Sequence, residues 1–278
     1  MSAADRYKIE YQILNQIPDA PPRIIEVHAS PEEIDALAEE GYLVRDGMFS
    51  GDALEELRDA LDRLEQRERR TGVGTVGDMA FGGFFMRYLM DKDPVFLGMM
   101  KFQPFLSVAR ALMGPQIQMS MSARISYPAP ENQETMWHQH LRYIPKPLPK
   151  WAMLPQCMDV LLYLDDVTDA NGPLCIVPGT HKQIQDQPPG NYYGDLPDQK
   201  VLYPKAGTAV FLHANLWHRA RPTTLEGKKR RLLLFGFYPT WLKRNVYPGK
   251  PENGLTSELL NRSDDVEIQE LFGKIGYM

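Results

Sequence analysis

Cysteine is scarce in this sequence, with only Cys157 and Cys175 among 278 residues. Two cysteines cannot form a disulfide framework, and because both lie in apolar runs we expect buried thiols in a reducing compartment. The sequence also lacks any run of about 18 apolar residues, so no membrane-spanning helix is expected. The first residues are polar and contain no apolar signal-peptide core. These absences together predict a cytoplasmic protein with no membrane partner.

An excess of positive charge is missing as well. The chain has 31 Lys and Arg against 36 Asp and Glu, which gives a net charge of -5. This balance argues against nucleic acid as a partner. Apolar residues make up 43% and charged residues 24%, which is typical of a globular protein. We therefore expect one folded domain over residues 1–278.

Helical signals dominate the first part of the chain. Residues 1–29 contain three prolines and are expected to be an irregular lead-in. Ser30, Pro31 and Glu33 form a capping box that opens a helix. Helical spacing of leucines then predicts a second, amphipathic helix after Ser50. The part from 30 to 114 is accordingly predicted to be mainly helical.

The pattern changes after residue 114. Short β-prone runs, separated by turn residues, occur at 116–127, 136–144, 157–166, 173–178, 201–204, 208–213 and 230–238. Helices followed by many short strands predict an α+β chain whose core, at 115–240, is a β-sandwich or barrel. Residues 241–278 are expected to form a C-terminal tail that is irregular except for a short helix near 266–273.

Three of the six histidines suggest a metal site. Residues two apart on a strand point to the same face, so His138 and His140 would project together into the space that the sheet encloses. His218 follows the apolar run that ends at His213 and is the third candidate. Histidine ligands on one face of a metal, with the opposite face open, are typical of non-haem iron oxygenases.

Basic residues at the start of the last apolar strand suggest an anionic ligand. A guanidinium that faces a barrel interior is costly unless an anion meets it, and a small dicarboxylate would meet it through a bidentate pair. Arg230 and Arg231 are both candidates, because neighbouring strand residues face opposite sides. Lys228 and Lys229 are expected to belong to a solvated turn.

The chain resembles the phytanoyl-CoA dioxygenase family of Fe(II)/2-oxoglutarate oxygenases over roughly residues 32–240. The resemblance is strongest in the Asn-Gly-Pro-Leu and Pro-Gly-Thr-His-Lys segments. The blocks that carry it are Glu40–Val44, Trp137–Gln139, Leu164–Thr168, Asn171–Leu174, Val177–Lys182 and Gly207–Phe211. It implies a double-stranded β-helix (jelly-roll, cupin-like) core flanked by N-terminal helices. It also implies oxidative decarboxylation of 2-oxoglutarate to succinate, coupled to oxidation of a substrate.

One position departs from the family pattern. Family members typically read His-Gln-Asp, whereas this sequence reads His138-Gln139-His140. Fe(II), one aspartate and the 2-oxoglutarate dianion sum to a charge of about -1, and three neutral imidazoles bring the sum to about 0. A face of nitrogen ligands also favours Cu(II), Ni(II) or Zn(II) more than a mixed face does.

The resemblance also implies roles for individual residues. His138 and His218 would be the proximal and distal metal ligands, and His140 would be a third ligand, or a histidine that hydrogen-bonds nearby. Arg230, twelve residues after His218, would bind the C5 carboxylate of 2-oxoglutarate, with Arg231 as the alternative. Arg124 would touch 2-oxoglutarate or substrate, although an exposed strand charge is the simpler interpretation.

Other side chains have simpler explanations. Tyr143 and Trp151 follow the metal-binding segment and would line a substrate pocket, or else pack in the core. Asp165 is expected in a turn and His181 in a structural contact. His213 competes with His218 but lies inside a strand run where the family has no ligand.

The leading hypothesis is therefore an Fe(II)/2-oxoglutarate-dependent dioxygenase that uses dioxygen to oxidise a small organic substrate. Two alternatives remain. One is a three-histidine iron dioxygenase that does not use 2-oxoglutarate, and the other is an inactive family member that acts as a binding partner. The sequence leaves the substrate open, as well as assembly into a homo-oligomer.

Overall fold

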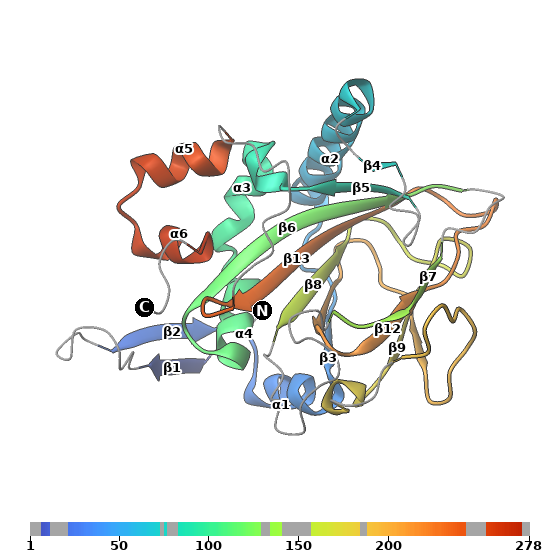
Figure 1. Cartoon of the computed structure of the whole chain (residues 1–278), viewed down its shortest axis with the longest axis horizontal. Coiled ribbons are helices and arrows are strands. Elements are labelled where there is room, and N and C mark those ends of the chain that lie inside the picture. The colour runs from blue at the N-terminus through green and yellow to red at the C-terminus, as the bar shows by residue number, and fades with distance from the viewer. Residues whose placement is uncertain are drawn as a thin grey trace.

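A computed structural model describes residues 7–11, 22–72, 75–76, 83–128, 134–140, 157–183, 188–242 and 254–273. Two antiparallel sheets dominate these residues (Figure 1). The large sheet has the strand order β3-β11-β8-β13-β6-β5-β4 and the small sheet the order β10-β9-β12-β7. The large sheet comprises β3 (Tyr42–Arg45), β4 (Thr75–Val76), β5 (Phe84–Arg87), β6 (Ile117–Ser126), β8 (Met158–Tyr163), β11 (Ala209–His213) and β13 (Arg230–Pro239). The small sheet comprises β7 (Thr135–His138), β9 (Leu174–Val177), β10 (Lys200–Leu202) and β12 (Trp217–Ala220).

The chain alternates between the two sheets from β6 onward. Strands β6, β8, β11 and β13 belong to the large sheet, and β7, β9 and β12, which lie between them in sequence, belong to the small sheet. This alternation winds the chain into a double-stranded β-helix, so the expected α+β fold with a jelly-roll core is confirmed.

The two faces of β13 show how the sequence builds this core. Successive strand residues point to opposite faces. Arg230, Leu232 and Leu234 line a cavity between the sheets. Leu233 and Phe235 instead belong to the apolar core on the other face of the sheet. The residues after Arg231 are apolar in an unbroken run because both faces of β13 are buried, one towards the cavity and the other in the apolar core.

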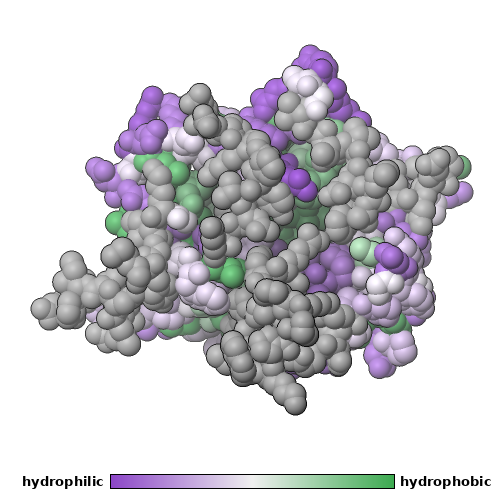
Figure 2. Space-filling view, viewed as in Figure 1, coloured by the Kyte–Doolittle hydropathy of each residue, from purple (hydrophilic) through white to green (hydrophobic). Residues whose placement is uncertain are grey.

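Helices cover the outer face of the large sheet. Ser30 and Glu33 form the expected capping box of α1 (Pro31–Glu40). The leucine stripe of α2 (Gly51–Thr71) is buried, and Figure 2 shows hydrophilic side chains gathered over this helix. The remaining elements of this layer are η2 (Leu89–Asp91), α3 (Pro94–Gly98), η3 (Met99–Lys101) and α4 (Gln103–Met113). No helix in the described part of the chain is both long enough and apolar enough to cross a membrane.

Both ends of the chain are more regular than the sequence predicts. Within the expected irregular lead-in, β1 (Tyr7–Tyr11) pairs with β2 (Arg23–Val27), because Ile25 and Val27 alternate into the core and the prolines fall outside the two strands. The expected irregular tail contains α5 (Leu255–Arg262) as well as the predicted short helix, α6 (Val266–Leu271). Two strands near the site also differ from prediction: β7 ends at His138, within the predicted run 136–144, and β12 lies outside every predicted run.

Candidate metal centre

The three candidate histidines converge between the sheets. His138, at the end of β7, lies directly opposite His218 of β12 in the strand register. Their ring centroids are 4.1 Å apart, and the His140 centroid lies 5.2 Å from that of His138 and 4.9 Å from that of His218. One ligand atom from each ring lies within 4.8 Å of the others, so the group can hold a metal ion.

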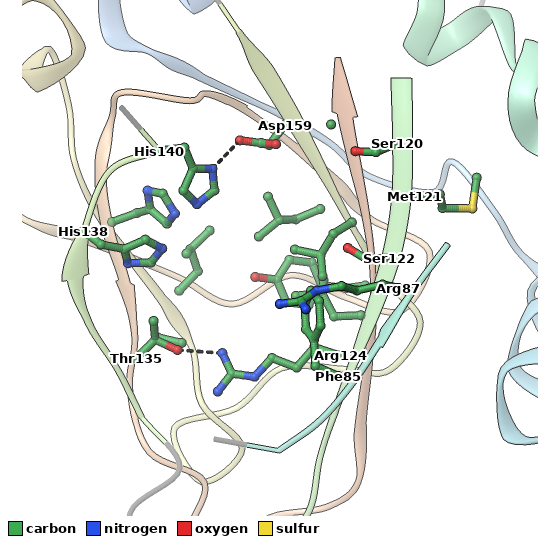
Figure 3. A pocket seen from close by; sticks show the side chains of 18 of the residues that line it. Phe85, Arg87, Ser120, Met121, Ser122, Arg124, Thr135, His138, His140 and Asp159 are labelled. Atoms are coloured by element: carbon green, nitrogen blue, oxygen red, sulfur yellow. Dashed lines mark hydrogen bonds and ion pairs between the residues drawn. The ribbon is translucent and has the colours of Figure 1, made fainter. Parts of the chain in front are cut away.

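His140 reaches the group from beyond the strand. The expected alternation over 136–144 does not apply, because β7 ends at His138. The backbone N–H of His140 instead donates to the carbonyl oxygen of Ala214 at 2.7 Å. Its ring Nδ1 contacts Asp159 Oδ2 at 2.6 Å, as Figure 3 shows. Two contacts outside the β7 ladder thus position this imidazole.

Hydrogen bonds define which ring nitrogen faces the centre. The Nδ1 atoms of His138 and His218 lie 2.9 Å and 2.7 Å from the carbonyl oxygens of Met136 and Leu216. A carbonyl or carboxylate oxygen only accepts, so all three Nδ1 atoms must donate a proton. Each Nε2 then carries the lone pair that a metal ion requires.

The electrostatics favour the neutral form of His218. Burial, followed by the nearby His140, lowers the pKa of His218 to about 4. A neutral ring is the form that binds a metal. Three nitrogen donors, two from residues 138–140 and one from β12, therefore fit a divalent transition metal.

Two buried guanidinium groups, those of Arg124 and Arg230, line the cavity on the side of the large sheet. Arg230 is only 2% exposed and Arg124 only 8%. Burial lowers the pKa of Arg230, and burial followed by the charge of Arg230 lowers the pKa of Arg124 to about 9. Arg124 donates to Thr135 Oγ1 at 2.6 Å (Figure 3). The exposed-charge interpretation of Arg124 is wrong, because this residue lies on the inner face of β6.

Arg230 is held by neutral groups. Its Nη1 donates to the carbonyl oxygen of Gly172, and its Nη2 donates to Ser126 Oγ at 3.2 Å. Its buried Nε has no hydrogen-bond partner, and no ion pair joins Arg230 to any described residue. A buried cation in this setting is stabilised most by an anion in the cavity.

Arg231 points to the opposite face of the sheet. It pairs with Asp165 and with Asp62 of α2, both at 2.8 Å. Lys229 also pairs with Asp62, at 2.7 Å, so the expectation of a solvated turn is wrong for this residue. Of the two neighbouring arginines, Arg230 is therefore the one that lines the cavity.

His213, His181 and Asp165 lie outside the cavity. His213 and His181 form a separate buried pair, with ring centroids 4.8 Å apart. His181 also contacts the carbonyl oxygen of Ala38 at 2.8 Å, as expected of a structural residue. Asp165 is engaged by Arg231 and does not line the cavity. Tyr143 and Trp151 lie outside the described residues.

The cavity around these groups has a volume of about 330 Å³. Its walls follow positions on four strands of the large sheet and three of the small one. The cavity has further polar groups besides the three histidines, Arg124 and Arg230, and they include Arg87, Tyr88, Ser120, Ser122 and Tyr238. The space can thus hold a small polar ligand in addition to a metal.

Sequence reasoning missed Asp159 as a site residue. Asp159 lines the cavity next to His140. The available signal was a single carboxylate inside the apolar run 157–163, since an isolated acid in a buried strand normally has a specific partner.

Comparisons with known proteins agree with this geometry. The sequence model of the family described as phytanoyl-CoA dioxygenase (PhyH) matches residues 37–231. The chain is 24% identical to an ectoine dioxygenase of Stutzerimonas stutzeri, over 67% of this chain and 70% of that protein. It is 22% identical to an L-proline trans-4-hydroxylase of Streptomyces griseoviridis, over 76% of this chain and 87% of that protein.

Solved structures are similar in fold. HygX from Streptomyces hygroscopicus, crystallised with nickel and 2-oxoglutarate bound, superposes with a TM-score of 0.60 at 19% identity, over 78% of this chain and 91% of that chain. The non-heme alpha ketoglutarate dependent carbocyclase SnoK from nogalamycin biosynthesis gives a TM-score of 0.60 at 17% identity, over 84% and 91% of the two chains. At these identities the similarity establishes the fold alone.

Proposed function

The chain belongs to the phytanoyl-CoA dioxygenase family of Fe(II)/2-oxoglutarate-dependent dioxygenases, and we propose that His138, His140 and His218 hold its iron while Arg230 anchors its 2-oxoglutarate. The observation that carries the proposal is the convergence of three imidazoles in a cavity that also holds a buried, neutrally bonded guanidinium. A metal and a dicarboxylate complement these two features.

The three imidazoles each contribute one nitrogen to the metal. Their Nδ1 protons are held by oxygen acceptors, which keeps the rings oriented. A bound iron would supply the activation of dioxygen, which accepts four electrons: two would come from 2-oxoglutarate as it is oxidised to succinate and CO₂, and two from the substrate. The protein contributes the geometry and a site enclosed between the two sheets.

Arg230 binds the distal carboxylate of 2-oxoglutarate. A guanidinium presents two parallel N–H donors to a carboxylate, and such a charge-assisted pair is strong where water is excluded. Arg124 lies on the same wall and adds a second positive charge. Binding of the dianion thus relieves the repulsion between these two buried cations.

The substrate is a small polar organic molecule. Hydroxyl groups of Ser120, Ser122 and Tyr238, together with the guanidinium of Arg87, line the cavity. Such groups select ligands that can form hydrogen bonds. The names of two similar proteins give ectoine and L-proline as substrates, and compounds of that size suit a cavity of about 330 Å³.

Succinate release tests this function. The Fe(II)-loaded protein is incubated with 2-oxoglutarate, dioxygen and a panel of amino acids and cyclic amino acids. We expect substrate-stimulated succinate, and we expect His138→Ala to lower both iron content and succinate release at least about tenfold. His28→Ala, a histidine outside the cavity, serves as the control. Substrate oxidation without any need for 2-oxoglutarate would indicate the alternative three-histidine dioxygenase instead.

A further inference from the structure

Asp159 is the one carboxylate among the described residues that line the cavity. It is the second residue of β8 and lies opposite Gly236 of β13 in the strand register. Because Asp159, Leu161 and Tyr163 alternate along β8, the carboxylate faces the cavity and not the helical layer.

The Asp159 carboxylate holds the imidazole that departs from the family pattern. Its Oδ2 lies 2.6 Å from Nδ1 of His140, and the two side chains are 13% and 34% exposed. A hydrogen bond of this length to a carboxylate fixes the ring orientation and makes the opposite nitrogen a stronger donor to a metal. Asp159 also interacts electrostatically with His218, so its charge acts on two of the three rings.

No structural cation accounts for this carboxylate. Among the described residues, Asp159 forms no ion pair with a lysine or an arginine, and its partner is His140. A largely buried carboxylate without a cation is costly. A divalent metal on the far side of the His140 ring would supply the missing positive charge.

Charge counting gives the reason for this arrangement. The usual family motif places an aspartate where this chain has His140, so the ligand set loses one negative charge. Asp159 lies directly behind His140 and places one negative charge next to the same site. The charge is therefore retained but displaced by the width of one imidazole ring.

We propose that Asp159 is a positioning residue that acts through His140 and replaces the charge of the missing carboxylate ligand. This inference rests on the proposed function. It predicts that the metal site depends on the pair His140 and Asp159 as a unit, and that a carboxylate at position 140 would make Asp159 dispensable.

The variants Asp159→Asn, Asp159→Ala, His140→Asp and the double variant His140→Asp/Asp159→Asn test this proposal. Asparagine keeps an acceptor for the His140 Nδ1 proton but removes the charge, whereas alanine removes both. Asp165→Asn is the matched control, because Asp165 is 18% exposed and pairs with Arg231 away from the cavity. Co(II) affinity is measured by competition with a chromophoric chelator, and thermal unfolding of the metal-free proteins reports on folding.

We expect Asp159→Asn to weaken Co(II) binding about 10–100-fold, with Asp159→Ala weaker still and Asp165→Asn within twofold of wild type. In the His140→Asp background the Asp159→Asn change should cost nothing. If Asp159→Asn does not fold, the double variant His140→Asp/Asp159→Asn still tests the proposal. It must bind Co(II) at least as tightly as His140→Asp.

Two results would overturn the inference: wild-type affinity in Asp159→Asn, or an equal loss in both backgrounds. A wild-type protein that binds no metal would instead refute the proposed function itself. The two failures are therefore distinguishable.

Discussion

Arg230 and Arg231 are neighbours in the sequence, yet they lie on opposite faces of one strand. Arg230 enters the cavity and bonds to Gly172 and Ser126. Arg231 pairs with Asp62 and Asp165 on the helix side. The strand period of two makes them physically different residues despite their identical chemistry.

Replacement of Arg230 should therefore affect 2-oxoglutarate specifically. We expect Arg230→Gln to weaken 2-oxoglutarate binding by about 2 kcal/mol or more, about thirtyfold, because one partner of a buried charged pair is lost. Metal affinity should change little. Calorimetric titration of 2-oxoglutarate into the metal-loaded protein measures the 2-oxoglutarate affinity, and titration of the metal into the metal-free protein measures the metal affinity.

Arg231→Gln is the matched control for that experiment. It removes the same charge from the same strand but on the opposite face, so 2-oxoglutarate affinity should stay within about twofold of wild type. If both variants weakened 2-oxoglutarate equally, Arg230 would not be the anchor.

For single residues, the sequence predicts which side chains belong to the candidate site but not which other side chains they contact. The three histidines and Arg230 follow from the motif and the strand pattern. Asp159 was missed because its partner, His140, is 19 residues away and comes close only where the two sheets face each other across the cavity. The choice between Arg230 and Arg231 likewise needs the strand register, and a shift of one residue would exchange them.

Among the elements, the turn at 171–173 connects a sequence motif to the cofactor pocket. Asn171 fixes the turn, since its Oδ1 accepts from the backbone N–H of Thr168 at 2.6 Å and its Nδ2 donates to the carbonyl oxygen of Asp166 at 2.8 Å. Gly172 has φ +80°, and a Cβ there would lie 2.7 Å from Nη1 of Arg230. The glycine therefore allows Arg230 to pack against the turn.

Gly172→Ala should consequently disturb both the fold and the pocket. The added methyl group meets Arg230 and the carbonyl oxygen of Arg221 at 2.8 Å, so the guanidinium must shift. We expect 2-oxoglutarate affinity to fall at least about tenfold, in addition to a backbone cost of about 1–2 kcal/mol for a non-glycine residue at positive φ.

Gly179→Ala separates these two effects. Gly179 has a similar φ of +78°, but no atom lies within 4 Å of a Cβ built there. This variant should lose stability in urea unfolding and keep its 2-oxoglutarate affinity. Equal loss of affinity in the two alanine variants would contradict the role given to Gly172.

Strand boundaries near the site were harder to predict than the strands themselves. The strands β6, β8, β11 and β13 were recognised because β6 alternates polar and apolar residues and the other three lie in largely apolar runs. The four-residue β12 lies outside every β-prone run predicted from the sequence, since Trp217–Ala220 contains two polar residues and has no clear alternation. Its pairing with β7 and β9 makes it a strand, and that pairing is not encoded locally.

Over the whole molecule, an ionic network joins the helical layer to the jelly roll. Arg231 and Lys229 of the β13 region contact Asp62 of α2, and Lys229 also contacts Glu65. Burial alone would raise the pKa of the Asp62 carboxyl, but hydrogen bonds from Arg231 and Lys229 outweigh it and lower the pKa below 3.8.

A lowered pKa in the folded state makes stability depend on pH in one direction. The contribution is complete above the unfolded value of 3.8 and is lost as the pH falls through the lower folded value. The difference in unfolding free energy between wild type and Arg231→Gln should therefore be large at neutral pH and shrink as the pH falls below about 4.

Urea unfolding at several pH values measures this difference. Lys228→Gln is the control, because Lys228 is exposed and should show little dependence. A difference between wild type and Arg231→Gln that is constant from neutral pH to pH 3 would contradict the network account.

The central claim is that one metal held by three imidazoles and one buried guanidinium together bind 2-oxoglutarate. The most direct measurement is an anaerobic calorimetric titration of 2-oxoglutarate into the protein with and without Fe(II). We predict one 2-oxoglutarate per chain when Fe(II) is bound and a much weaker interaction when it is absent. No binding to the iron-loaded protein, or equal binding in both forms, would contradict the claim.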